Sequence, residues 1–250
     1  MRNALAAGAL AALVGCIGTG TETGNPSATV QASIGLTAFS SDPSAVSLPA
    51  DGASGGVRLT EAWVSVKQIN LVRQAICDGS TEQEIEFTGP VGDLAATGSL
   101  LEVLEIPATD YCRVRIRIDE PEDGAPAEIA GSSVVLRGTT AAGTPFELRS
   151  EERFQLLLRS RGQPFTIDET RDAILLAFDV KRWFDGVPLD DGTPTGGTIV
   201  IDEDSNPGLL AAFQDKVNAS LAVYRDRDGD GDLDDDERES LTEEGEDDDD

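Results

Sequence analysis

One stretch near the C-terminus places acidic side chains at a regular spacing. It reads Asp226-Arg-Asp-Gly-Asp-Gly-Asp-Leu-Asp-Asp-Asp-Glu237. Carboxylates at every second position can gather around one point if the chain turns sharply, and Gly231 allows the positive φ that such a turn needs. Calcium is a hard cation that takes six to eight oxygen ligands at roughly 2.3–2.6 Å. We therefore expect this stretch to bind calcium.

The spacing fits the twelve-position calcium loop of an EF-hand, with glycine at the sixth position and an apolar leucine at the eighth. The expected ligands, in order, are Asp226, Asp228, Asp230, the backbone carbonyl of Asp232, Asp234 acting through water, and bidentate Glu237. The alternative is that a run so rich in aspartate and glycine matches by composition alone, as part of an acidic tail.

A helix is expected to lead toward this loop. Asn206-Pro207 is typical of a helix start, with proline at the first helical position. Apolar residues then recur every fourth position to Leu221 and predict one buried stripe. The segment after the loop has a single apolar residue, and we find no second loop to pair with the first. This favours a structural calcium site over a sensor, which opens a helix pair.

Composition limits the classes of partner and chemistry. The chain has 47 acidic and 19 basic residues and a formal charge of −28, half of it from Asp226 onward. So acidic a protein repels nucleic acid and instead attracts cations. Histidine is absent, which excludes Ser-His-Asp and Cys-His catalysis and removes the commonest zinc ligand.

The N-terminus has the arrangement of a lipoprotein signal peptide. Arg2 is followed by an apolar run to Val14 that is too short to span a bilayer. Leu13-Val14-Gly15-Cys16 resembles a lipobox, which predicts removal of residues 1–15 and acylation of Cys16. A plain signal peptide with an incidental cysteine is the alternative. Residues 16–26 are small and polar and predict a flexible tether.

The expected location follows from these residues. The acyl chains on Cys16 would hold the protein in the bilayer of the cell envelope without a transmembrane helix. Isoleucine rather than aspartate follows Cys16. By resemblance to Gram-negative lipoproteins, this favours the outer membrane. In that oxidising compartment we expect the two remaining cysteines, Cys77 and Cys112, to form a disulfide; two separate buried thiols are the alternative.

Strand periodicity dominates residues 27–204. The clearest case is Tyr111–Ile118, in which valine and isoleucine alternate with arginine, as a sheet with one buried face requires. A change of phase near Lys67-Gln68 within the Val57–Val72 strand predicts a β-bulge. Short strands separated by Gly, Pro and Asp turns predict a mainly β fold, an antiparallel β-sandwich with a short C-terminal helix and the EF-hand-like loop. The other strands expected are 29–39, 84–87, 101–106, 133–137, 146–149, 154–159, 173–180 and 199–201.

Three pieces of the chain resemble an uncharacterised family of bacterial lipoprotein domains. They are Val64-Ser-Val-Lys-Gln-Ile-Asn-Leu71, Ile106-Pro-Ala-Thr-Asp-Tyr-Cys-Arg-Val-Arg-Ile-Arg-Ile118 and Ile174-Leu-Leu-Ala-Phe-Asp-Val180. The segment after Cys16 also looks like that of lipoproteins common in myxobacteria. The resemblance implies a transthyretin-like or immunoglobulin-like β-sandwich and brings no known activity.

The remaining motifs have two interpretations each. Lys181-Arg-Trp-Phe184 is either an exposed aromatic platform or, as we favour, the closed end of the core. Arg113, Arg115 and Arg117 either bind an anion or form a solvated face paired with carboxylates, which is the commoner case.

The chain therefore divides into a signal peptide, a lipidated tether, a β-sandwich over 27–204, a helix with a calcium loop over 205–241, and a disordered acidic tail over 242–250. We expect a non-enzymatic, membrane-anchored binding or structural module with an unidentified partner at the surface or in the envelope. The alternative is a hydrolase of an extracellular polymer that uses a pair of carboxylates.

Overall fold

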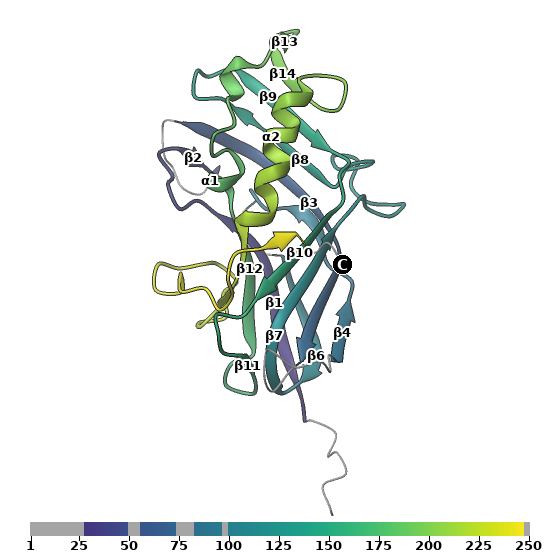
Figure 1. Cartoon of the computed structure of the whole chain (residues 1–250), viewed down its shortest axis with the longest axis vertical. Helices are drawn as coiled ribbons and strands as arrows, with labels where there is room; N and C mark the ends of the chain where they lie inside the picture. Colours follow the sequence, from purple (N-terminus) through teal and green to yellow (C-terminus); the bar gives the residue numbers. More distant parts are fainter. Residues whose placement is uncertain (1–27, 50–55, 74–82, 97–99, 248–250) are drawn as a thin grey trace, which may run out of the picture.

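The computed structural model describes residues 28–49, 56–73, 83–96 and 100–247. Within these ranges the fold is mainly β, with two sheets packed on one shared hydrophobic core. Figure 1 shows the elongated molecule with the single long helix along one end. The predicted fold class is confirmed.

The smaller sheet has four strands in the order β15-β12-β1-β6. Its strands are β1 (Thr29–Phe39), β6 (Leu100–Pro107), β12 (Ala173–Asp179) and β15 (Leu221–Arg225). Every residue of β12 is buried, which explains its continuous apolar sequence, because a strand covered on both faces has no reason to alternate.

The larger sheet is organised around one very long strand, β3 (Val57–Arg73). The first half of β3 pairs with β8 and the second half with β7. The register shifts between Val66 and Gln68, which confirms the predicted bulge. The other strands are β2 (Val46–Ser47), β4 (Gln83–Phe87), β5 (Val91–Asp93), β7 (Thr109–Ile118), β8 (Val134–Thr139), β9 (Pro145–Ser150), β10 (Phe154–Arg159), β11 (Phe165–Ile167), β13 (Pro194–Thr195), β14 (Thr198–Ile201) and β16 (Glu246–Asp247).

The expectation of purely antiparallel pairing is wrong at three places among the described strands. β1 runs parallel to β12, β2 to β3, and β14 to β9. β1 and β12 lie in the centre of the smaller sheet, and the chain between them builds most of the larger sheet. Such a long crossover permits parallel pairing, which a tight hairpin cannot. Alternating patterns in each strand do not reveal this connectivity.

Helix α2 (Pro207–Val217) packs on β9 and β14 and covers one end of the larger sheet (Figure 1). Leu209, Phe213 and Val217 form the predicted apolar stripe and are buried. Asn206 stands at the N-cap position, but its side chain does not cap the helix. It binds instead to the backbone of Thr193 and Val200, so it fixes the preceding loop.

The aromatic pair after β12 closes the core, as we favoured. Trp183 ends the short helix α1 (Val180–Trp183) and is 1% exposed, and Phe184 is 7% exposed. The indole Nε1 of Trp183 donates to Ser220 Oγ at 2.8 Å, which satisfies its one polar group inside the core. An exposed platform at this place is excluded.

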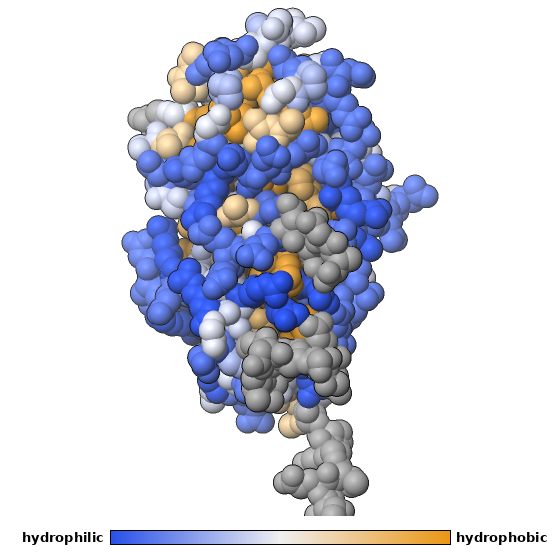
Figure 2. All heavy atoms as spheres, in the orientation of Figure 1, coloured by the Kyte–Doolittle hydropathy of each residue, from blue (hydrophilic) through white to orange (hydrophobic). Residues whose placement is uncertain are grey.

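Hydrophilic side chains cover most of the face shown in Figure 2, and the hydrophobic surface visible there gathers near α2. Over the described residues, no helix combines the length and apolar character needed to cross a membrane.

Candidate metal centre

The acidic loop begins directly at the end of a strand, not of a helix. The helix expected to continue to Leu221 ends at Val217, and one turn of 3₁₀ helix, η3 (Asn218–Ser220), leads into β15. Leu221 pairs with Phe178 of β12. Leu221 keeps the every-fourth spacing of the helix, but it is buried as the first residue of the edge strand β15 and not on the helix. The smaller sheet therefore fixes the start of the loop through β15.

Backbone N–H groups hold the first half of the loop in a tight turn. Asp226 is 4% exposed, and its carboxylate accepts from Gly229 N at 2.7 Å and from Gly231 N at 3.2 Å. Gly229 and Gly231 have φ of +75° and +86°, a conformation in which a side chain would be strained. Asp228 and Asp230 continue the pattern by accepting from the amide two residues on. The predicted sharp turn is present.

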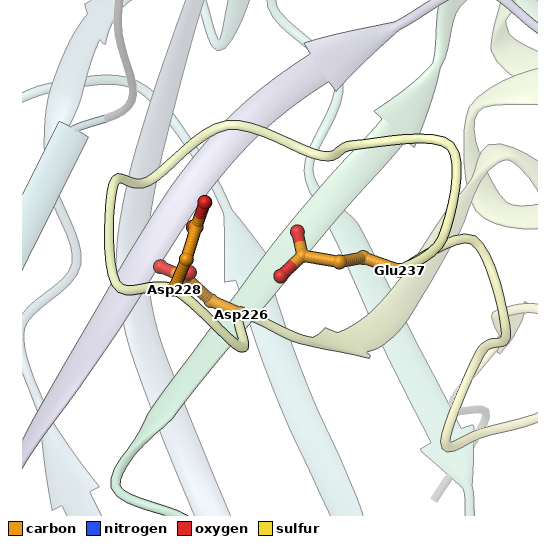
Figure 3. Close-up of side chains that lie close together, drawn as sticks. All are labelled: Asp226, Asp228 and Glu237. Atoms are coloured by element: carbon orange, nitrogen blue, oxygen red, sulfur yellow. The ribbon is translucent and has the colours of Figure 1, made fainter.

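The turn brings the carboxylates together as two groups that share Asp228. Oxygens of Asp226, Asp228 and Glu237 lie within 4.8 Å of one another, and so do those of Asp228, Asp230 and Asp234. Figure 3 shows the Glu237 side chain reaching across the loop toward Asp226 and Asp228. Two oxygens that both lie at about 2.3–2.6 Å from one calcium ion are at most roughly 5.2 Å apart. The spacing within the first group is therefore small enough for its oxygens to surround one calcium ion. The same is true of the second group taken by itself.

Glu237 closes the loop from the far end. It is 3% exposed, and its two carboxylate oxygens accept from the backbone amides of Arg227 and Asp234. Both oxygens therefore point inward, as bidentate coordination requires. Asp232 belongs to neither carboxylate group, in keeping with the prediction that it would contribute its backbone carbonyl.

The two arginines of this region pair with acids outside the expected ligand positions. Arg227 Nη1 lies 3.8 Å from Asp236 Oδ2, and Arg238 Nη2 lies 3.3 Å from Asp235 Oδ1. Among the described residues, the carboxylates at the ligand positions have no salt bridge to a basic side chain. The site thus gathers negative charge that only backbone amides offset.

The uncompensated charge is reflected in the ionisation of the loop. Burial, opposed by the Gly229 and Gly231 amides and reinforced by Glu237 and Asp228, raises the pKa of Asp226 above its usual range. The pKa of Asp234 is raised by desolvation and by the neighbouring aspartates. A bound cation would oppose both pKa shifts, because it adds positive charge beside the carboxylates.

The other predicted site residues fall partly outside the described ranges. Cys16 and Cys77 lie there, so lipidation and the Cys77–Cys112 disulfide stay predictions. Cys112 is buried on β7, and its carbonyl accepts from Ser160 N at 2.8 Å.

The segment after the loop was expected to be a disordered tail, but it is ordered as far as Asp247. Thr242 is completely buried and forms a β-bridge with Ser160, and β16 pairs with β10. The uniformly acidic composition hides this order, because the pairing uses backbone groups of an exposed sheet edge. Sequence reasoning also missed β15: its first residue, Leu221, is predicted as the end of the helix, and residues 222–225 are predicted only as the link to the loop.

No protein-family model, curated protein or solved structure matches this chain.

Proposed function

We propose that this protein is a non-enzymatic module of the cell envelope, anchored through acylated Cys16 and stabilised by one structural calcium ion. The observation that carries the calcium assignment is the loop Asp226–Glu237. Its carboxylates converge, its backbone donors already orient them, and its arginines pair elsewhere. All the side chains of the proposed donor set offer oxygen, which suits calcium and not softer metals.

Calcium at this position would fasten the C-terminal segment across both sheets. After the loop the chain returns to β15, where Leu241 N donates to Val223 O at 2.7 Å and Val223 N donates to Thr242 Oγ1 at 3.1 Å. It then meets the larger sheet, where Arg161 N donates to Leu241 O and β16 pairs with β10. We define Leu241–Asp247 as the C-terminal strap.

The end of the loop is also attached to the smaller sheet. The guanidinium of Arg238, next to Glu237, lies 5.6 Å from the ring centre of Phe39 on β1. Phe39 packs edge-on against Tyr224 of β15 at 5.9 Å. A cation that fixes Glu237 thereby fixes the point where the strap begins, which is a structural role and not a sensor's opening movement.

The proposed anchor would keep the module close to the membrane. Thr29, the first residue of β1, stands thirteen residues after Cys16 in the chain. Fully extended, this stretch spans at most roughly 45 Å. The net charge of −28 would keep the module from settling on anionic lipid. The calcium concentration outside the cytoplasm suits a site with a Kd of about 10⁻⁴–10⁻³ M.

Calorimetric titration with calcium tests the proposal. The wild-type protein is compared with Asp226→Asn/Glu237→Gln, and with Asp235→Asn/Asp236→Asn as a matched control. The control removes the same charge from the same loop at positions that ion-pair with Arg238 and Arg227. One saturable site that is lost in the first variant and kept in the control supports the proposal. Equal binding by both variants, or no heat at millimolar calcium, contradicts it.

The hydrolase alternative needs two carboxylates free to act across a cleft. One hollow of about 240 Å³ is lined in part by Asp179 and Glu244. Both carboxylates bind the same guanidinium, that of Arg182, and Asp179 also caps α1 through Lys181 N. Carboxylates engaged in this way support the structural interpretation.

A further inference from the structure

The three arginines of β7 do not share one environment. They lie on the outer face of the larger sheet, where they alternate with buried Val114, Ile116 and Ile118. Arg115 forms a salt bridge with Glu84 of β4. The guanidinium of Arg117, by contrast, makes no hydrogen bond or salt bridge to a described residue, and its Nε is buried without a hydrogen-bond partner. Because the chain has 47 acidic residues, an arginine without a carboxylate partner is unexpected.

The acids around Arg117 are already paired with other cations. Asp119, two residues along β7, binds Arg153 Nε at 2.8 Å. Glu122 binds Lys67 Nζ at 3.3 Å, and Glu84 is held by Arg115. These three carboxylates are therefore engaged by other cations, and none of them forms a salt bridge with Arg117.

Arg117 lines a hollow of about 250 Å³ together with Gln68, Asn70, Arg115, Ile116 and Gln155. The amides of Gln68 and Asn70 are fixed, because Gln68 Nε2 donates to Asn70 Oδ1 at 3.0 Å and Asn70 Nδ2 donates to Glu84 at 2.9 Å. Gln155 faces Arg117 across the strand pair, and its side chain makes no hydrogen bond to a described residue. The hollow is smaller than the roughly 300–1,000 Å³ of pockets for drug-sized ligands, so it suits a single small group.

We propose that this hollow is a binding site for a small hydroxylated oxyanion, a sugar acid or a sugar phosphate. The planar guanidinium of Arg117 matches the paired oxygens of a carboxylate or phosphate. The carboxamides of Gln155 and Gln68 each offer donors and an acceptor, which is the complement of neighbouring hydroxyl groups. The site lies on the larger sheet and contains no residue of the acidic loop. The oxyanion proposal can therefore be tested independently of the calcium proposal.

NMR titration of the purified, ¹⁵N-labelled protein tests this inference through the Nε–Hε signal of Arg117, assigned by its loss in Arg117→Lys. The probes are galacturonate, glucose 6-phosphate and uncharged galactose. The expected result is a saturable shift with at least one of the two acids and none with galactose. The acid that binds more tightly identifies the anionic group.

Two variants with the same change in charge separate a site from general attraction. The variants are followed through the side-chain amide signals of Gln155, which lines the same hollow and is kept in all of them. Arg117→Gln is expected to weaken binding at least about ten-fold, the usual value of a charge-assisted hydrogen bond. Arg153→Gln, on the same face but paired with Asp119, is expected to change it less than about two-fold. If Arg117→Gln does not fold, Arg117→Lys serves instead, because it keeps the charge and loses the planar fork.

Three results would overturn the inference. The Arg117 signal could stay unmoved by both acids at tens of millimolar, galactose could bind as tightly as the acids, or both glutamine variants could weaken binding equally.

Discussion

The acidic loop Asp226–Glu237 and the outer face around β7 differ in how their charged side chains are paired. On the outer face, carboxylates form salt bridges with single cations, as Glu84 does with Arg115 and Asp119 does with Arg153. In the loop, Asp226 and Glu237 are buried with only backbone amides as partners. Charges of one sign that are held together without a counter-charge are costly. Buried acids without a neighbouring cation therefore favour a bound cation, whereas an acidic surface alone does not.

The largest effect expected from this comparison is the loss of stability when calcium is removed. Calcium at 10 mM with a Kd of about 10⁻⁴–10⁻³ M adds roughly 1.4–2.7 kcal/mol. For a domain of this size, that shifts the unfolding midpoint by roughly 3–10 °C. Thermal unfolding with calcium and with a chelator measures the shift. Asp226→Asn/Glu237→Gln should show none of it, and a shift of the same size in that variant would break the comparison.

The second effect is a dependence of the calcium response on pH. The pKa of Asp226 is raised above its ordinary value of 3.8, chiefly by burial. Without calcium, its contribution to stability is therefore present at low pH and is lost as the pH rises through the raised pKa. Calcium requires the ionised form, so protons compete with it. The calcium-induced shift should therefore decrease as the pH is lowered from 7.5 into the range where the carboxylates take up protons; a shift that does not change with pH would contradict the assignment of Asp226 as a ligand.

The third effect concerns the outer face, where removal of a carboxylate should destabilise the protein whether or not calcium is present. Glu84→Gln breaks the pair with Arg115 and weakens the bond from Asn70. Because the pair is partly exposed, we expect a loss of about 0.5–1 kcal/mol, and less at high salt. Urea unfolding measures it. Glu86→Gln, on the exposed side of β4, is the matched control and should be neutral.

The smallest effect has the opposite sign. Without calcium, Asp228→Asn removes a negative charge from both carboxylate groups. Relief of the repulsion should leave the protein as stable as the wild type, or more stable by a few tenths of a kcal/mol. With calcium, the same variant should be less stable than the wild type. Urea unfolding in both conditions tests this reversal, and a loss of stability in calcium-free buffer would show that the loop does not store repulsion.

Most of the strands could be predicted from sequence, and so could the loop. β1 and β7 follow their alternating patterns, and the bulge in β3 follows from the change of phase at Lys67-Gln68. The turn of the loop could be predicted because it depends on residues within the loop, namely Gly231 and the alternating acids.

What could not be predicted depends on partners distant in sequence. Leu221 fits a helical stripe and becomes a strand only because β12 offers an edge. Four of the seven residues of the strap are acidic, which suggests a solvated tail, and its order comes in part from backbone pairing with β10. The separate environments of Arg115 and Arg117 depend on β3 and β10 lying beside β7 and on β4 lying beyond β3. The spacing along β7 does not contain this arrangement.

The most direct test of the central claim follows the backbone amide of Gly231 by NMR during a calcium titration. This amide donates to Asp226 Oδ2 at 3.2 Å, so it reports on the carboxylate that the account places at the first ligand position. We expect a saturable, one-site change in the chemical shift of the Gly231 amide, larger than at any residue of the outer face. A Gly231 signal that stays unchanged while exposed acids elsewhere respond without saturation would contradict it.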